Sequence, residues 1–353
     1  MYIKLIFVFF SSITALFLLR KLAKRIGLVD KPNERKRHEG VIPLVGGIAI
    51  CLTITQFLIY HPNLFEHSNL YITCILILTI VGAIDDKFDL SFKVRLLVQA
   101  SLSFCMIYWA GLELHTLGDM FALGDINLGY LGYLITIFAV IGAINAFNMV
   151  DGIDGLLGGL SIVSFSGLAI MLFIDNQIYL SYICLVFIVA IIPYVLFNLG
   201  FFGRKRKVFM GDAGSMLIGF TIIWMLLLAS QNGTKPPLRP VTALWLIAVP
   251  LMDMAAIMIR RIRRGDSPFK PDREHLHHIF QRLGFSSWQT LLIICFIAIC
   301  YASFGILGEV INIPEYIMFG IFVLLFVVYS FLLSYVWRIS SFIRRIKINK
   351  IKV

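Results

Sequence analysis

The sequence predicts an all-α, polytopic integral membrane protein with about eleven transmembrane helices. Of its 353 residues, 59% are hydrophobic and 14% are charged, and the mean hydropathy is +0.89. These values lie far outside the range of soluble globular domains. A helix needs roughly 17–25 apolar residues to cross the hydrocarbon core of a bilayer. Eleven runs are candidates: 2–19, 41–60, 68–84, 96–112, 128–147, 157–174, 178–199, 213–231, 240–259, 287–308 and 316–337.

The first and last runs have basic flanks. Run 2–19 lacks a small-residue cleavage site and continues directly into Arg20-Lys21-Leu22-Ala23-Lys24-Arg25. It is therefore predicted to be a retained anchor and not a cleavable signal peptide. The tail 338–353 has Arg and Lys among isoleucines, a pattern that favours contact with anionic lipid. The sequence between the runs is too short for a separate soluble domain, so residues 1–353 are predicted to form a single transmembrane domain.

The basic residues predict the orientation of the chain. With eleven spans the loops alternate between two sides, and 28 of the 31 Lys and Arg residues fall on one side. Such asymmetry places that side in the cytoplasm, the N-terminus outside and the C-terminus inside. The net charge of +11 is then explained by topology, and nucleic-acid binding is not needed. The six cysteines lie inside apolar runs without a CxxC pair and are expected to be packing residues.

Four polar clusters fall on the predicted cytoplasmic side. Carboxylates at a membrane boundary are costly, and they usually persist because a cation or a reacting group needs them. The clusters are Asp85-Asp86-Lys87-Phe88-Asp89; Asn145, Asn148, Asp151 and Asp154; Phe209-Met210-Gly211-Asp212-Ala213-Gly214-Ser215; and the loop 260–278 with Arg261, His275, His277 and His278.

These residue types indicate phosphoryl transfer. Aspartates without thiolates suit a hard divalent cation with oxygen ligands. Magnesium is usually held by one or two carboxylates together with substrate phosphates, which leaves other carboxylates free for proton transfer or substrate hydrogen bonds. Arg and His side chains in the 260–278 loop offer further positive groups for phosphate oxygens. The combination favours a diphosphate donor, with catalysis by positioning and charge neutralisation.

The acidic clusters also have structural interpretations. Asp85 and Asp86 could begin a solvated loop. Asn148, Asp151 and Asp154 could cap a helix together with the nearby glycines; if they are helical, their three-residue spacing places them on one broad face. Asp212 could be the N-cap of the helix that follows, a place that also suits a metal ligand.

The histidines and Asp253 leave alternatives open as well. No fourth ligand has zinc-like spacing to the three histidines, so phosphate or sugar contact, or a surface patch beside Arg273, remain as interpretations. Asp253 lies seven residues before Arg260 and could form an ion pair with it or take part in catalysis.

Two other classes of protein compete with this interpretation. Asp85-Asp86-x-x-Asp89 matches the magnesium-diphosphate motif of intramembrane prenyltransferases. Those enzymes do not need the histidine loop or the Gly211-Asp212-Ala213-Gly214 turn. A membrane transporter would need polar groups at several depths, whereas here they gather on one side.

The motifs together resemble the polyprenyl-phosphate N-acetylhexosamine-1-phosphate transferases. Six matched blocks in the family's order make the resemblance specific over nearly the whole chain. It rests on Pro43-Leu44-Val45-Gly46-Gly47, Asp85-Asp86, Asn145-x-x-Asn148-x-x-Asp151-Gly152-x-Asp154-Gly155, residues 209–215, Pro250-Leu251-Met252-Asp253 and His275-x-His277-His278.

The resemblance implies transfer of GlcNAc-1-phosphate from UDP-GlcNAc to undecaprenyl phosphate in the bacterial inner membrane, with Mg²⁺, replaceable by Mn²⁺, as cofactor. The implied process is the start of O-antigen, lipopolysaccharide or related surface-glycan synthesis. By position the implied roles are metal binding for Asn148 and Asp212, catalysis for Asp85, Asp86, Asp151 and Asp154, and substrate binding for Asn145, Arg261, His275, His277 and His278.

Within the family, the GlcNAc branch is favoured over the branch that transfers muramyl-pentapeptide. Val29-Asp30-Lys31-Pro32-Asn33 and Pro271-Asp272-Arg273-x-His275-x-His277-His278 carry this likeness, and Leu276 interrupts the histidine run that is typical of the other branch. The sequence leaves open the epimer of the sugar, the downstream glycan, the oligomeric state (a homo-oligomer included), the division of aspartates between metal and substrate, and a direct or two-step mechanism.

Overall fold

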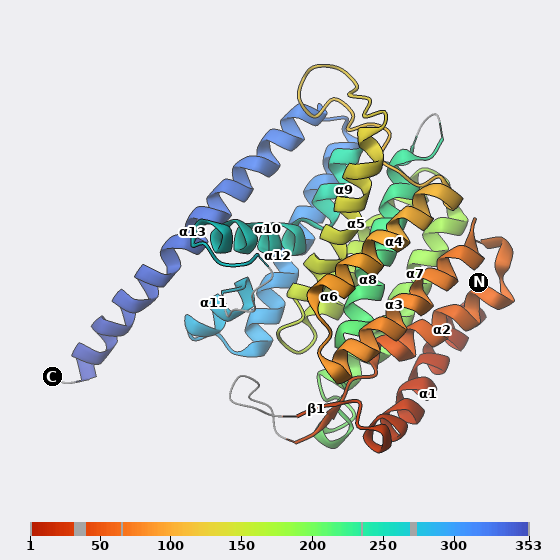
Figure 1. Ribbon diagram of the computed structural model, residues 1–353. Coiled ribbons are helices and arrows are strands. Elements are labelled where there is room, and N and C mark those ends of the chain that lie inside the picture. Colours follow the sequence, from red (N-terminus) through yellow and green to blue (C-terminus); the bar gives the residue numbers. More distant parts are fainter. Residues whose placement is uncertain (1, 32–39, 65, 234–235, 269–273, 352–353) are drawn as a thin grey trace.

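The computed structural model describes residues 2–31, 40–64, 66–233, 236–268 and 274–351, with backbone alone over 336–351. These residues form a bundle of helices with one short pair of strands (Figure 1). The helices are α1 (Tyr2–Ile26), α2 (Gly46–Tyr60), α3 (Ser68–Phe88), α4 (Phe92–Ala110), α5 (Leu131–Met149), α6 (Leu156–Ile174), α7 (Ile178–Asn198), α8 (Gly211–Gln231), α9 (Pro240–Leu246), α10 (Ala248–Arg263), α11 (Leu276–Arg282), α12 (Ser287–Val310) and α13 (Glu315–Ile351).

The prediction of a polytopic, all-helical membrane protein is confirmed. Eight helices in the described part of the chain are long and apolar enough to cross a membrane, and α9 with α10 makes a ninth if this bent pair is one span. Ten of the eleven predicted runs coincide mainly with one helix each, and run 240–259 is divided between α9 and α10. The count of eleven stays a prediction, because α2 has only 15 residues and α4 carries Lys93, Arg95 and Gln99 in its first half.

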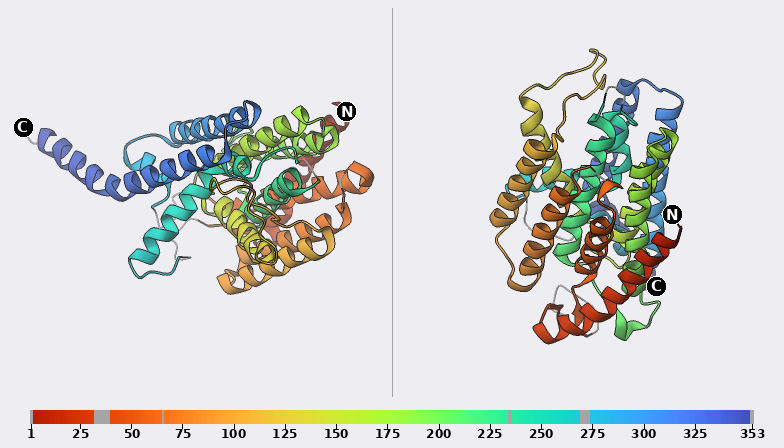
Figure 2. Two further views of the ribbon diagram at one scale, coloured as in Figure 1. Left: turned by 90° about the horizontal axis from the view of Figure 1, so that it is seen from above. Right: turned by 90° about the vertical axis from the view of Figure 1, so that its right-hand side faces the viewer.

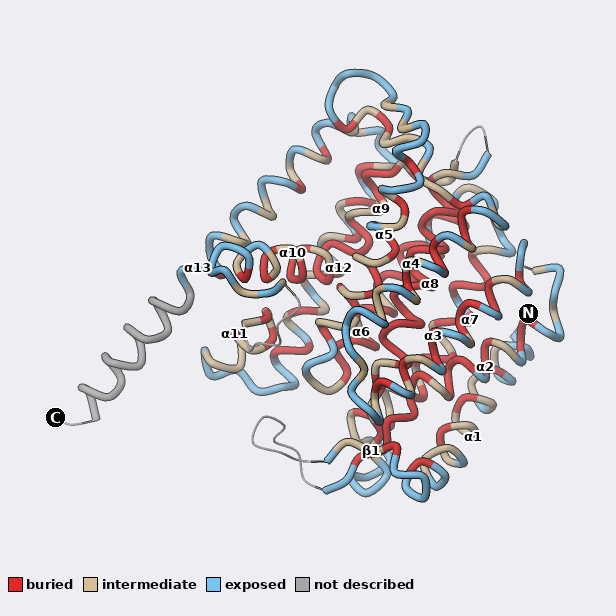
Figure 3. Tube along the Cα trace, viewed as in Figure 1, coloured by how far each residue is buried: buried red, intermediate tan, exposed pale blue. Residues whose placement is uncertain are grey.

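Helix α8 is the centre of the bundle. All of its 18-residue apolar window is buried, and it packs against α2, α3, α5 and α6 (Figure 3). A helix that is apolar on all sides is expected in such a place. Glycines permit the close contacts: a Cβ on Gly47 of α2 would lie 2.1 Å from the Cα of Gly214, and one on Gly82 of α3 would lie 2.4 Å from Ala213. Small residues let helices approach closely where the bilayer offers no hydrophobic driving force.

The segments that carry the polar clusters meet at one end of the bundle. The connections after α3, α5 and α7 lie at this end together with β1 (Val29–Asp30), while the long connection from α4 to α5 lies at the opposite end (Figures 1 and 2). Strand β1 pairs antiparallel with β2 (Ile42–Pro43). Beyond β2, Leu44 forms a parallel β-bridge with Phe209. This bridge connects the segment before α2 to the segment before α8.

The C-terminal third of the chain leaves the direction of the bundle. Helices α9 and α10 meet at an angle of 83°, and α10 runs across the other helices with α11 below it (Figure 1). Helix α10 ends in the basic residues Arg260, Arg261 and Arg263. The long helix α13 packs against both α10 and α11, so the last helix of the chain supports the histidine segment. Lys270 and the predicted loop motif Pro271-Asp272-Arg273 lie outside the described residues.

Candidate active site

The carboxylate of Asp86 caps the N-terminal end of α8. The backbone N–H groups of Asp212 and Ala213 donate to the two oxygens of Asp86 at 2.9 and 3.4 Å. Gly211 has a φ of +74°, and a Cβ there would lie 2.4 Å from Asp86 Oδ2, so only glycine fits. A carboxylate at a helix N-terminus satisfies free N–H groups and complements the helix dipole. The interpretation of Asp212 as the N-cap is therefore wrong: Asp86, from α3, has the capping role.

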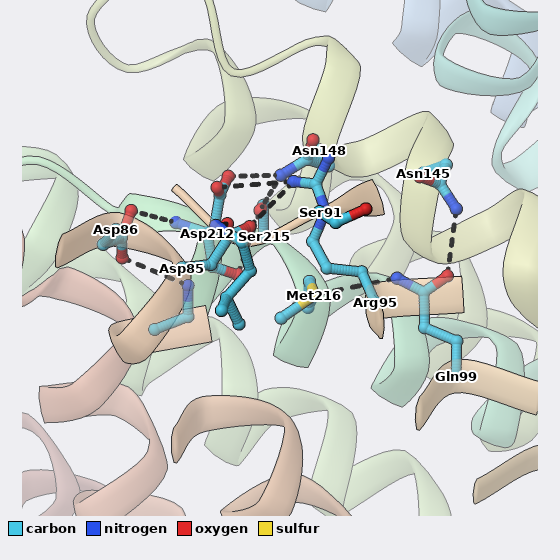
Figure 4. A network of polar contacts seen from close by, with 12 residues as sticks. Asp85, Asp86, Ser91, Arg95, Gln99, Asn145, Asn148, Asp212, Ser215 and Met216 are labelled. Atoms are coloured by element: carbon cyan, nitrogen blue, oxygen red, sulfur yellow. Dashed lines mark hydrogen bonds and ion pairs between the residues drawn. The ribbon is translucent and has the colours of Figure 1, made fainter. Parts of the chain in front are cut away.

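Asp85, Arg95 and Asp212 form a charged cluster from three helices (Figure 4). Arg95 Nη1 of α4 lies 2.8 Å from Asp85 Oδ2 and 3.6 Å from Asp212 Oδ2. Asp85 is buried, and its other oxygen accepts the N–H of Leu90 at 2.7 Å. A guanidinium between two carboxylates lowers the cost of keeping both ionised at a membrane boundary. The sequence did not single out Arg95, because it lies ten residues beyond Asp85 among other basic residues of a membrane flank.

Asn148 joins this cluster from the end of α5. Its amide nitrogen donates to Asp212 Oδ1 at 2.6 Å and to Ser215 Oγ at 2.8 Å. Asn148 and Asp212, the two residues expected to hold a metal, are thus in direct contact although 64 positions separate them. An asparagine amide carries both a donor and an acceptor group, and rotation about its last bond exchanges them.

Asn145 is directed elsewhere. One turn before Asn148, its amide nitrogen donates to Gln99 Oε1 at 3.1 Å and to the carbonyl of Ile141 at 2.8 Å. Gln99 is buried on α4 and also reaches the sulfur of Met216 on α8. This second network runs alongside the carboxylate cluster (Figure 4) and links α4, α5 and α8. Asn145 therefore braces the helices that hold the cluster.

Asp151 and Asp154 lie in the turn between α5 and α6. The expectation of one helix face for both is wrong, because α5 ends at Met149 and Gly155 takes a φ of +77° before α6 begins. Asp151 is exposed, yet desolvation by the surrounding protein and repulsion from Asp212 and Asp154 raise its pKa to about 7. Asp154 pairs with Lys207 at 2.5 Å, which ties this turn to the basic segment before α8.

The histidine helix α11 lies against the same turn. His277 is buried, and a Cβ on Gly152 would lie 2.0 Å from its Nε2, so the ring packs directly on the backbone between Asp151 and Asp154. Burial and the neighbouring His278 lower the pKa of His277 to about 3, which keeps this ring neutral at neutral pH. Its Nε2 has no hydrogen-bond partner among the described residues.

His275, His278 and Arg261 surround this contact. The ring of His275 is parallel to that of His277 at 5.9 Å, and His278 lies 4.1 Å from His277. Arg261 is buried at the end of α10, where its Nη1 donates to the carbonyl of Pro268 at 2.6 Å. The structure thus brings the histidines to the Asp151–Asp154 turn and places Arg261 at the base of the loop that leads to them.

The donor set fits a divalent cation that is shared with substrate phosphates. In the described ranges, no three His, Cys, Asp or Glu side chains are grouped as a complete metal cage. Magnesium does not require one, since one or two carboxylates plus phosphate oxygens suffice. The cluster and the adjacent turn hold five carboxylates, from Asp85, Asp86, Asp151, Asp154 and Asp212, against the two cationic groups of Arg95 and Lys207. This excess of negative charge suits a metal cation more than it suits a bare phosphate.

A helical bundle in the membrane, with carboxylates, an arginine and histidines gathered at one end, defines a class of membrane-embedded transferases for anionic substrates. The profile of glycosyl transferase family 4 matches residues 68–230, from the start of α3 almost to the end of α8. This match includes the carboxylate cluster but not the histidine helix.

Relatives extend the similarity to nearly the full length. The undecaprenyl-phosphate alpha-N-acetylglucosaminyl 1-phosphate transferase of Yersinia pestis is 51% identical over 345 residues, 98% of this chain and 94% of that protein. Proteins of the same name from Escherichia coli K12 and Pasteurella multocida are each 50% identical over 348 residues, covering 97% and 98% of this chain and 94% and 97% of their own lengths. The chain therefore belongs to the family of these N-acetylglucosaminyl 1-phosphate transferases, which confirms the resemblance that its motifs carry.

Proposed function

We propose that the protein transfers GlcNAc-1-phosphate from UDP-GlcNAc to undecaprenyl phosphate, with GlcNAc-diphospho-undecaprenol and UMP as products. The observation that carries the proposal is the meeting of Asp85, Arg95, Asn148 and Asp212 at one end of the bundle. Four helices, α3, α4, α5 and α8, each contribute one of these side chains. The near-full-length identity to transferases of that name supports the choice of substrates.

The reaction exchanges one diphosphate bond for another. An oxygen of the lipid phosphate attacks the phosphorus that bears the sugar, the bond from this phosphorus to the bridging oxygen breaks, and UMP leaves with that oxygen. No external energy source is needed, and the step is reversible. The lipid phosphate is already an anionic nucleophile at neutral pH, so repulsion between anions dominates the barrier.

Arg95 and Asp85 are assigned to the lipid phosphate. The guanidinium of Arg95 uses one nitrogen on the carboxylates, and its other donors are suited to a phosphate in a bidentate arrangement. Asp85 orients Arg95 and can accept a proton from a monoprotonated lipid phosphate. Asp86 contributes by fixing the start of α8, since its oxygens already accept two backbone N–H groups.

The turn after α5 and the histidine helix are assigned to the sugar nucleotide. Asp151 and Asp154 lie toward the nucleotide, with Lys207 beside Asp154 to balance its charge. His277, neutral and with an unpartnered Nε2 within the described structure, offers a hydrogen bond to the sugar-phosphate side. His275, His278 and Arg261 complete that side, and Asn145 contributes by bracing α5.

Asp212 and Asn148 are the residues proposed to hold Mg²⁺ or Mn²⁺. Such an ion, when bound, neutralises phosphate charge and polarises the phosphorus that is attacked. Ser215 accepts a hydrogen bond from Asn148 and so orients the amide. The catalytic contribution of the chain itself is to hold these groups rigidly on a buried helix, which avoids reorganisation during the reaction.

The orientation follows from the charges. We place the end with the carboxylate cluster in the cytoplasm, the N-terminus in the periplasm and the C-terminus in the cytoplasm, because 28 of the 31 basic residues fall on that side. The whole chain then acts as one catalytic domain in the bacterial inner membrane, at the start of O-antigen, lipopolysaccharide or related glycan synthesis. UDP-GlcNAc is a cytoplasmic nucleotide sugar, which agrees with this orientation.

The test is an assay with the purified full-length protein, undecaprenyl phosphate and labelled UDP-sugars, with and without Mg²⁺. The expected result is release of UMP and a labelled lipid from UDP-GlcNAc, in larger amount than from UDP-GalNAc and only with the metal. Release of inorganic diphosphate from a prenyl donor would instead establish the prenyltransferase alternative. Retention of a labelled phosphosugar on protein incubated without the lipid would establish a two-step mechanism in place of direct attack.

A further inference from the structure

Asp253 has a different environment from the one that its spacing to Arg260 indicated. It is 1% exposed, and three donors use its carboxylate. His275 Nδ1 lies 2.8 Å from Oδ2, and Oδ1 accepts the N–H of Leu276 at 3.0 Å and the hydroxyl of Tyr329 at 2.5 Å. Arg260 instead contacts Glu274 at 3.1 Å. The ion pair between Asp253 and Arg260 is thus not the arrangement that the structure adopts.

The carboxylate of Asp253 sets the position of α11. It accepts the first N–H of this helix, at Leu276, and thereby caps it from a different helix. It also fixes the ring of His275, the residue before the helix, by taking its Nδ1–H. Helix α11 has only seven residues and is too short to be stable without such support. His277, on the first turn of α11, is then held against Gly152.

Tyr329 connects this arrangement to the last helix of the chain. It projects from α13, and its hydroxyl donates the third hydrogen bond to the carboxylate of Asp253. Around it, Ala256 and Ile257 of α10, Ile279 of α11 and Leu333 of α13 form a small apolar cluster. The carbonyl of Leu333 also accepts a hydrogen bond from Arg260 at 3.1 Å. Helix α13 therefore buttresses the histidine helix at the point where it faces the carboxylate turn.

We propose that Tyr329 and Asp253 are positioning residues for the sugar-nucleotide side of the site, and that the contact runs from Tyr329 through Asp253 and the start of α11 to His277. The proposal rests on the proposed function, because the consequence is a change in the binding of UDP-GlcNAc. The hydrogen bond from Tyr329 fixes the orientation of the Asp253 carboxylate. In this orientation the carboxylate accepts the hydrogen bonds of His275 and Leu276 that position α11. Tyr329 acts at a distance and does not contact the reacting atoms.

Removal of the hydroxyl in Tyr329→Phe tests the proposal by kinetics. A hydrogen bond to a charged group is worth about tenfold or more in an equilibrium, so we expect the KM for UDP-GlcNAc to rise by about tenfold. The KM for undecaprenyl phosphate is expected to stay unchanged, because the hydrogen bonds of Asp253 lead to α11 and α13 and not to Asp85 or Arg95. Tyr316→Phe, on the same helix and 43% exposed, is the matched control and should leave both constants unchanged.

A double variant separates positioning from general damage to the fold. If Tyr329 acts through His277, then in a His277→Ala background the change Tyr329→Phe should raise the KM for UDP-GlcNAc by less than about twofold. A further rise of about tenfold in that background would show independent effects and would overturn the proposed connection. Equal rises in the KM for both substrates would also overturn it, since they would indicate a loosened bundle.

Hydrogen exchange gives a readout that does not depend on activity. In Tyr329→Phe the amides of residues 276–282 should exchange about tenfold faster than in the wild type, while those of α8 and the Tyr316→Phe control stay unchanged. Unchanged exchange in α11 would overturn the positioning role. If the wild type releases no UMP from UDP-GlcNAc and undecaprenyl phosphate, the proposed function fails, and the exchange of α11 still decides the positioning role separately.

Discussion

Arg95 is the side chain whose importance only the structure revealed, and its replacement by glutamine provides the sharpest test of the site. At an effective dielectric constant of about 20, the attraction between Arg95 Nη1 and Asp85 Oδ2 at 2.8 Å is about 6 kcal/mol before desolvation. Desolvation offsets much of this, and a charge-assisted hydrogen bond contributes about 1.5–3 kcal/mol net. If the same guanidinium also receives the lipid phosphate, Arg95→Gln should lower kcat/KM for undecaprenyl phosphate by about 10- to 150-fold.

The assay for this prediction is the release of UMP at varied undecaprenyl phosphate and saturating UDP-GlcNAc. Lys93→Gln is the matched control, because it removes one positive charge from an exposed residue of the same helix. The rate of this variant should remain near that of the wild type. Arg95→Lys keeps the charge but not the planar fork and should fall between the two. A value for Arg95→Gln within about twofold of the wild type would refute the assignment of Arg95 to the phosphate.

The carboxylates, the pH dependence and the helix packing lead to further expectations. Asp212→Asn and Asp151→Asn should each lower turnover by about 10²- to 10³-fold in protein that still inserts into the membrane; near-normal UMP release by both would remove the basis of the site. Because its surroundings raise the pKa of Asp151 to about 7, the ionised form is lost as the pH falls through that value. The kcat/KM for UDP-GlcNAc should therefore decline below about pH 7 in the wild type, and the pH profile of the residual activity in Asp151→Asn should lack this decline; the same decline in both proteins would assign the titration to another group. Gly47→Ala should destabilise the bundle by about 1–3 kcal/mol or more, since its Cβ would meet the backbone of Gly214 at 2.1 Å. The measurement is thermal unfolding in detergent, with Gly320→Ala as the control because a Cβ there would meet nothing within 4 Å. The control should unfold at or slightly above the wild-type temperature. Equal effects of the two changes would argue against close packing of α2 on α8.

The polar clusters illustrate how far local sequence can lead. Asp85, Asn148 and Asp212 were each identified as unusual because charged and amide groups are rare at membrane boundaries. Their separation along the chain does not reveal that Asn148 contacts Asp212 at 2.6 Å. That contact depends on the packing of α5 on α8, where a Cβ on Gly219 would lie 2.6 Å from the Cα of Ile144.

The different roles of the neighbouring aspartates Asp85 and Asp86 could not be predicted from the sequence. Asp85 and Asp86 are adjacent residues of the same type, yet Asp85 pairs with Arg95 and Asp86 caps α8. Consecutive residues of a helix point about 100° apart, so the two carboxylates must face different neighbours. Which neighbours these are depends on the position of α4 and α8 around α3. Similarly, the spacing of Asp253 and Arg260 allowed a local ion pair or a catalytic role, whereas in the structure the carboxylate binds His275 and Tyr329.

The sequence by itself determined the class of fold, the positions of most of the long apolar helices and the chemical character of the site. These depend on hydropathy, on the distribution of basic residues and on the cost of charge at a membrane boundary, all of which can be evaluated along a single chain. Only the tertiary structure decided that Arg95 stands between two carboxylates, that Asp86 caps α8 and that Tyr329 reaches back to Asp253. Each of these arrangements includes a contact between helices that are distant in the sequence, and the pairing of such helices is set by side-chain packing and close glycine contacts that no local pattern encodes.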